Sequence, residues 1–198
     1  MNVLSTSSTL AMAAAQGLYF LSPLLVASVL SAIVLRFDLF PCVRRPIDGG
    51  HTYRGRRILG DGKTWRGVLV AIVGSVGGVA LQKCLLHVPV WLPLVDYRKI
   101  DALSFGAVMG ASAMAGELPN SFVKRRLGIE RGAVASGPLQ AVFYVWDQVD
   151  MVTTVWPAMS SWLRPRPVVV ATSFAVAFLL HPLVSLIGYA VGARKSAR

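Results

Sequence analysis

Residues 116–126 read GELPNSFVKRR, and residues 146–150 read WDQVD. Both stretches place carboxylates at or inside long apolar segments, where a charged side chain is costly and usually marks a site. The first stretch adds a hydroxyl group and a run of cations. Together the two stretches predict a polar site close to a bilayer surface, and they favour metal-assisted chemistry on phosphates.

The segments around these stretches are long and apolar enough to cross a membrane. The 198 residues have a mean hydropathy of +0.59, and 55% of them are hydrophobic, which is typical of multi-span membrane proteins. A spanning helix needs about 20 residues. We therefore expect an all-α integral membrane protein with about five transmembrane helices in a single domain, residues 1–198. The expected spans are residues 17–35, 68–86, 102–118, 138–156 and 168–191, and the polar loops between them include 36–67 and 119–137.

The third and fourth expected spans are the weakest, because they carry Glu117, Asp147 and Asp150. The third span also contains Gly106 and Gly110, four residues apart. Small residues at this spacing let helix backbones approach closely, so we expect this step to lie at a helix–helix contact.

The net charge of +11 could indicate nucleic-acid binding, but its distribution indicates a membrane topology instead. Fifteen of the 20 lysines and arginines fall in the loops 36–67 and 119–137 and in the C-terminal tail. The positive-inside rule places these segments in the cytoplasm. We expect the N-terminus outside, with residues 1–16 as a short external tail, the C-terminus inside, and a site that faces the cytoplasm from the cell (inner) membrane.

The loop 36–67 contains a glycine-rich basic segment suited to phosphate. Glycines let backbone amides turn toward an anion. Residues 62–64 read GKT but do not form a P-loop, because that motif requires a glycine where Arg57 stands. We expect four side chains of this loop to bind substrate: Asp61, Lys63, Thr64 and Arg66.

The stretch 116–126 has helical spacing. Ser121 lies four residues after Glu117, three before Lys124 and four before Arg125, so a helix would place all four side chains on one face. Pro119 removes a backbone donor and favours a kink or break. The alternative is an ordinary helix end whose basic residues anchor it at the membrane surface.

Asp147 and Asp150 lie three residues apart, so they share a helix face and repel each other unless something positive lies between them. A raised pKa, a salt bridge to Lys124 or Arg125, or a divalent cation would each resolve the repulsion. Oxygen-only ligation suits Mg²⁺, which binds through one or two carboxylates together with substrate phosphates.

Three motifs in order resemble the CDP-archaeol synthase (CarS-like) family, which is related to the membrane CDP-diacylglycerol synthases. Residues 46–48 with 60–67 resemble its first-loop signature, residues 121–129 its second-loop signature, and residues 147–150 its paired-aspartate element. The family usually has aspartate where Glu117 stands. The resemblance implies Mg²⁺-dependent transfer of CMP from CTP to a lipid phosphate, with release of pyrophosphate, giving a CDP-lipid of the archaeol or diacylglycerol type.

These expectations define a candidate site. Asp147 and Asp150 bind Mg²⁺ with Glu117 as an added ligand, and Ser121, Lys124 and Arg125 hold the triphosphate; we count Asp147, Asp150, Lys124 and Ser121 as catalytic. The expected partners are CTP and a membrane lipid phosphate, without nucleic acid, and a homodimer is left open. The alternative function is a small ion or solute transporter with an acidic ion site, although no internal repeat typical of transporters is visible.

Overall fold

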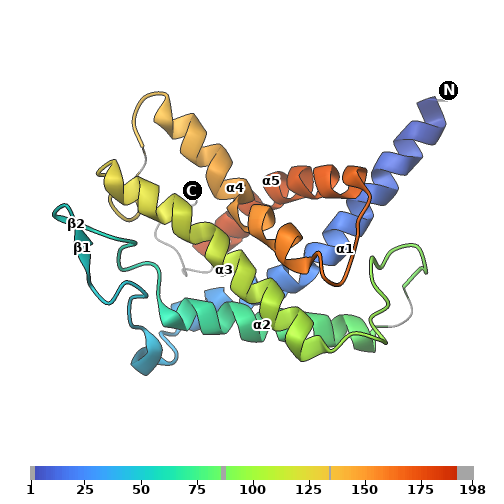
Figure 1. The fold of residues 1–198 in the computed structure, drawn as a ribbon, viewed down its shortest axis with the longest axis horizontal. Helices are drawn as coiled ribbons and strands as arrows, with labels where there is room; N and C mark the ends of the chain where they lie inside the picture. Colours follow the sequence, from blue (N-terminus) through green and yellow to red (C-terminus); the bar gives the residue numbers. More distant parts are fainter. Residues whose placement is uncertain (1–2, 86–87, 134, 191–198) are drawn as a thin grey trace.

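The computed structural model describes residues 3–85, 88–133 and 135–190, and these residues are mostly helical, as predicted. The five α-helices within them are α1 (Val3–Arg36), α2 (Trp65–Cys84), α3 (Ala102–Arg126), α4 (Leu139–Met159) and α5 (Pro167–Ala190). The loop between α1 and α2 carries a 3₁₀ turn, η1 (Pro41–Val43), and an antiparallel hairpin of β1 (Thr52–Tyr53) and β2 (Arg56–Arg57). Figure 1 shows this hairpin at one end of the molecule.

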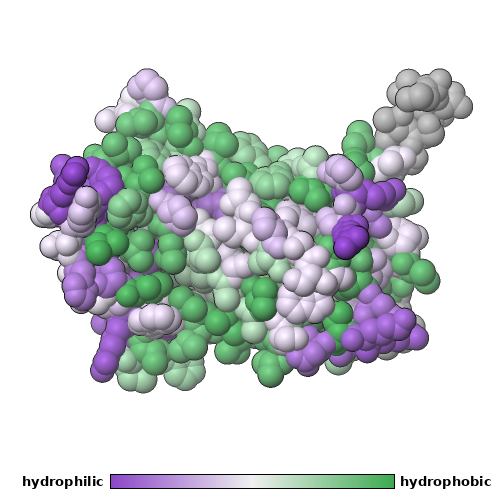
Figure 2. All heavy atoms as spheres, viewed as in Figure 1, coloured by the Kyte–Doolittle hydropathy of each residue, from purple (hydrophilic) through white to green (hydrophobic). Residues whose placement is uncertain are grey.

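Three segments are long and apolar enough to cross a membrane by length and composition: Thr9–Arg36, Trp65–Cys84 and Pro167–Val184. They belong to α1, α2 and α5. Many of their apolar side chains face outward; Val29, Val73 and Leu179, for example, are more than half exposed. In Figure 2 hydrophilic residues gather mainly at the two ends of the view, and hydrophobic residues cover much of the surface between them. This pattern suits a protein surrounded by lipid.

Two helix boundaries differ from the sequence prediction. The segment expected as an external tail is helical from Val3 onward, so α1 starts well before residue 17. The loop expected from residue 119 begins later, because α3 continues through Pro119 to Arg126. A proline is tolerated inside a helix where neighbouring helices hold the turn in place, and here both Gly116 and Asn120 are buried against α4.

Close contacts through glycines fix α2 between α1 and α3. A Cβ atom added to Gly78 would lie 2.5 Å from Pro23 Cα of α1. Added to Gly106 it would lie 2.5 Å from Val76 Cα of α2, and added to Gly110 it would lie 2.5 Å from the carbonyl oxygen of Ala71. The predicted packing step at Gly106 and Gly110 is therefore confirmed.

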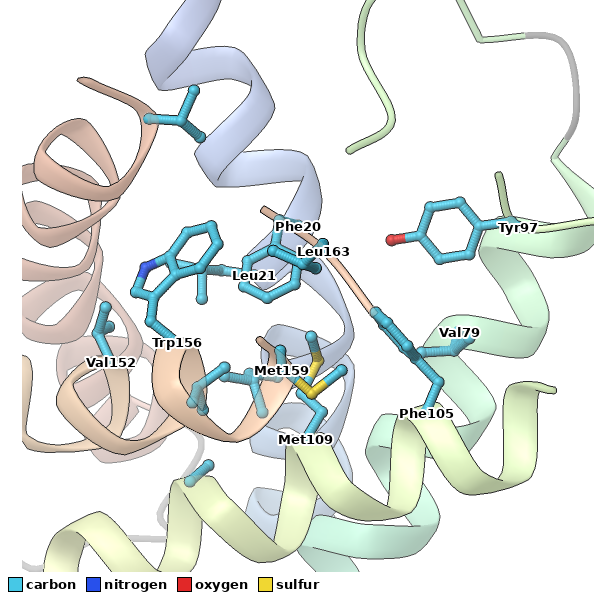
Figure 3. Close-up of a cluster of buried hydrophobic side chains, with 14 of the residues drawn as sticks. Phe20, Leu21, Val79, Tyr97, Phe105, Met109, Val152, Trp156, Met159 and Leu163 are labelled. Carbon is cyan, nitrogen blue, oxygen red and sulfur yellow. The ribbon is translucent and has the colours of Figure 1, made fainter. Parts of the chain in front are cut away.

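A buried apolar cluster joins all the helices away from the hairpin end. The rings of Phe20 and Trp156 stack with centroids 4.4 Å apart, and Phe105, Met109 and Met159 are fully buried beside them (Figure 3). One face of α4 thus enters the core through Trp156 and Met159. Its preceding turns, with Asp147 and Asp150, lie against the last turns of α3.

Candidate active site

The contact between α3 and α4 depends on Gly116. A Cβ atom added there would lie 2.5 Å from Thr154 Oγ1 and closer still to the carbonyl oxygen of Asp150. The Thr154 hydroxyl donates to the carbonyl oxygen of Ser112 at 2.7 Å, which adds a polar link between the two helices. This close approach brings Glu117 and the next turn of α3 up to the acidic turn of α4.

One amide joins the two aspartates. Asn120 Nδ2 donates to Asp147 Oδ1 at 2.6 Å and to Asp150 Oδ2 at 3.1 Å. The side chain of Lys124, one turn further along α3, forms an ion pair with Asp147. Asp150 is 5% exposed, and its other oxygen accepts from the backbone N–H of Met151 at 2.8 Å. The sequence prediction that these aspartates share a face is confirmed, and the salt bridge to Lys124, which was one of the alternatives, is present.

The loop before α2 also contributes a side chain to this group of charged residues. Lys63 forms an ion pair with Glu117, and both side chains are mostly buried. Each lysine therefore neutralises one carboxylate, and within the described residues Asp150 has no ion-pair partner. A buried carboxylate without a cation is costly, so a further positive charge beside Asp150 would stabilise this cluster.

The expected metal site at Glu117, Asp147 and Asp150 stays a prediction. Within residues 3–85, 88–133 and 135–190, no three acidic, histidine or cysteine side chains are grouped closely enough to hold one ion. Glu117 pairs with Lys63. The remaining pair still fits a hard cation, because Asp147 and Asp150 each bring a carboxylate oxygen to the same Asn120 nitrogen.

Asp48 organises the loop that carries Lys63. Its side chain is 1% exposed and accepts from Arg57 at 2.7 Å and from the backbone amides of Leu59 at 2.9 Å, Gly60 at 3.1 Å and Gly50 at 3.1 Å. Burial alone would raise the pKa of this carboxyl, but these hydrogen bonds outweigh burial and hold the pKa well below its usual range. Asp48 belongs to the first-loop motif, yet its sequence context does not reveal this structural role.

Two further contacts fix the loop against the helices. The backbone N–H of Ile47 donates to the carbonyl oxygen of Lys63 at 2.8 Å, which aligns the segment just before α2. Arg126, at the end of α3, donates to the carbonyl oxygens of Tyr53, Arg56 and Arg57, and its guanidinium lies over the Tyr53 ring. The hairpin and the lysine-bearing segment are therefore held in one position relative to α3.

Several predicted residues are engaged elsewhere. Arg66 is 5% exposed and donates to Asp38 at 2.6 Å and to the carbonyl oxygen of Leu39 at 2.9 Å, so it ties the start of α2 to the end of α1. Arg125 donates to the carbonyl oxygens of Leu59 and Ile129. These bonds give both guanidinium groups structural partners.

The other three predicted site residues lie in three different environments. Asp61 is mostly exposed and pairs with Arg57 at 2.5 Å. Thr64 caps α2, where its hydroxyl oxygen accepts from the N–H of Gly67 at 3.2 Å. Ser121 is half-buried on α3, one residue after Asn120. The structure thus groups Lys63, Glu117, Lys124, Asp147 and Asp150, and adds Asn120, which the sequence prediction did not include.

An apolar cavity of about 330 Å³ adjoins the cluster. Its walls come from all five helices and are mainly aliphatic. The polar side chains that line it are Ser28, Ser31, Thr64, Arg66, Glu117 and Gln148. Gln148 is 6% exposed, and its Oε1 atom has no hydrogen-bond partner among the described residues. A long apolar molecule with a polar head would find both chemistries here.

Comparisons with known proteins agree on one family. The CarS-like family, CDP-archaeol synthase, matches residues 11–196. The CDP-archaeol synthase of Halobacterium salinarum is 37% identical over 165 residues, covering 76% of this chain and 81% of the relative. That of Methanosarcina mazei is 35% identical over 171 residues, covering 76% of this chain and 89% of the relative.

A solved structure, described as an intramembrane enzyme for archaeal membrane lipids biosynthesis, is also similar. Its TM-score is 0.55 at 28% sequence identity, and the match covers 81% of this chain and 92% of that one. This likeness therefore extends over most of the chain.

Proposed function

The chain belongs to the CarS-like CDP-archaeol synthase family, and from this premise we propose that it transfers CMP from CTP to a lipid phosphate, releasing pyrophosphate. It is a membrane-embedded enzyme of the cytidylyltransferase type. The relatives give no support to the transporter alternative.

The observation that carries the proposal is the position of the charged cluster beside the apolar cavity. Glu117 belongs to both, since it lines the cavity and pairs with Lys63. A lipid with its chain in the cavity would bring its phosphate to Lys63 and Thr64. CTP would approach from the basic loops, with its triphosphate toward Lys124.

The reaction requires little acid–base catalysis from the protein. An oxygen of the lipid phosphate, already anionic, attacks the α-phosphorus of CTP, and the bond from that phosphorus to the departing pyrophosphate breaks. Catalysis then consists of holding the reactants in line and neutralising charge. Lys63 and Lys124 can supply this charge if phosphate oxygens replace the carboxylates that they now contact.

Asp147 and Asp150 are the residues suited to Mg²⁺. Bound there, the ion would neutralise charge on the phosphates of CTP. The two aspartates already lie within hydrogen-bond reach of one atom, Asn120 Nδ2, so little rearrangement of their carboxylates is needed.

We further propose the topology. All five helices span the membrane, α3 and α4 carry the site toward the cytoplasmic surface, and the N-terminus lies outside. The support is the concentration of cations in the α1–α2 loop and in the last turn of α3. The tail cations Arg194, Lys195 and Arg198, which also favoured this orientation, lie outside the described residues.

A substrate panel tests the function. Purified protein would be incubated with CTP, Mg²⁺ and either a diether isoprenoid glyceryl phosphate or a diester phosphatidate, and pyrophosphate and CDP-lipid would be measured together. We expect equal amounts of both products with at least one lipid, and none with ATP or without lipid. Failure to form CDP-lipid from any lipid phosphate would contradict the proposal.

A further inference from the structure

Asn120 is the residue of the cluster whose hydrogen bonding is incomplete. It is 3% exposed, and its nitrogen donates to both Asp147 and Asp150. Its oxygen, Oδ1, is also buried and has no hydrogen-bond partner within the described residues. An unpaired buried acceptor costs about 1–3 kcal/mol, so the side chain is only half satisfied where it stands.

The charges of the cluster explain why the nitrogen faces the aspartates now. Two carboxylates approach the amide, and an amide oxygen pointed at them would be repelled. With a cation between Asp147 and Asp150, the preference reverses, because the cation attracts an oxygen and repels the N–H groups. The oxygen and nitrogen of an asparagine amide have nearly the same shape, so turning the amide exchanges the two without moving the helix.

Asn120 is also better placed than Glu117 to act as a third oxygen ligand. Glu117 is held by Lys63, whereas Asn120 touches both aspartates directly. Carboxylate and amide oxygens are hard ligands of the kind that divalent magnesium and its spectroscopic substitute manganese accept.

We propose that Asn120 is a ligand of the divalent cation through Oδ1, with Asp147 and Asp150. This inference rests on the proposed function only in that a divalent cation binds at the aspartates. It assigns the amide two states: a donor to two carboxylates without the cation, and a neutral oxygen ligand with it.

Binding of Mn²⁺ to the purified protein, followed by electron paramagnetic resonance without CTP or lipid, tests the assignment separately from catalysis. We expect Asn120→Ala to weaken Mn²⁺ affinity by about 10–100-fold. The matched control is Gln82→Ala, which removes another buried amide with an unpaired oxygen, but one that contacts Tyr19 and Ser22 instead of the aspartates. This control should bind Mn²⁺ as the parent protein does.

Asn120→Asp tests the role if the alanine variant folds poorly. It supplies an oxygen ligand but no N–H group, so Mn²⁺ should raise its melting temperature more than that of the parent protein. Unchanged or tighter Mn²⁺ binding by Asn120→Ala would overturn the proposal and leave the amide as a spacer between the carboxylates. A parent protein that forms CDP-lipid but binds no Mn²⁺ would overturn the inference and leave the reaction class intact.

Discussion

Replacing Gly116 with alanine should push α3 and α4 apart and displace the residues of the candidate site. The added methyl would lie 2.5 Å from Thr154 Oγ1, and ordinary contact begins near 3.4 Å, so α3 and α4 must separate by about 1 Å. The Thr154 side chain can turn away, but the nearby carbonyl oxygen of Asp150 belongs to the backbone and cannot. We expect a loss of about 1–3 kcal/mol in the free energy of unfolding.

The same shift should reduce turnover, because Gly116 adjoins Glu117 and contacts Asp150 directly. A misplacement of about 1 Å can lower a rate by about 100-fold. The assay is CDP-lipid formation per folded protein, with thermal unfolding in detergent measured on the same sample.

Two glycine variants serve as controls. Gly106→Ala creates a clash of the same size, 2.5 Å to Val76 Cα, but at the contact of α3 with α2. It should lose similar stability and much less turnover. Gly77→Ala meets no atom within 4 Å and should be neutral or stabilising by up to about 1 kcal/mol. Equal turnover losses in Gly116→Ala and Gly106→Ala would refute the view that Gly116 positions the site.

Three further changes test the structure around the site and the role of one lysine within it. Asp48→Asn should loosen the α1–α2 loop and increase its cleavage by trypsin at neutral pH. Because the pKa of Asp48 is lowered in the folded protein, its stabilisation of the loop is present above the ordinary carboxyl pKa and is lost only as the pH falls through the lowered value. The loop of the parent protein should therefore stay protected in mild acid. Arg66→Gln should lower stability by about 1.5–3 kcal/mol, and combining it with Asp38→Asn should cost less than the sum of the two single changes, since the Arg66–Asp38 pair is lost in both while the Arg44–Asp38 pair is lost in only one. Lys124→Gln should lower kcat by about 100–1,000-fold, because it removes a charge from the transferring phosphate, and kinetics with CTP and lipid varied separately would reveal a pure KM effect instead.

Much of the helical layout could be predicted from the sequence. Long apolar runs determine α2, α4 and α5, whose observed ends lie within about three residues of the expected ones. The pairing of Asp147 with Asp150 also followed from spacing alone, since a helix places residues three apart on one face.

Side-chain partners could not be predicted in the same way. Lys63 and Arg66 lie three residues apart in one basic segment, yet Lys63 reaches the acidic cluster and Arg66 turns to Asp38. The difference arises from tertiary packing, which puts the end of α1 on one side of this segment and α3 on the other. Asn120 was not predicted for a similar reason. An uncharged amide forms no recognisable sequence pattern, and its role is evident only from its contacts with Asp147 and Asp150.

Transfer of label from α-³²P-CTP into lipid tests the central claim most directly. With the parent protein, Mg²⁺ and a lipid phosphate, radioactivity should enter the lipid fraction as CDP-lipid, while Asp150→Asn should reduce incorporation by about 100-fold or more and remain folded. Asp101→Asn, which alters a helix cap at the other end of α3, should incorporate label normally. Undiminished incorporation by folded Asp150→Asn would contradict the placement of the reaction at this cluster.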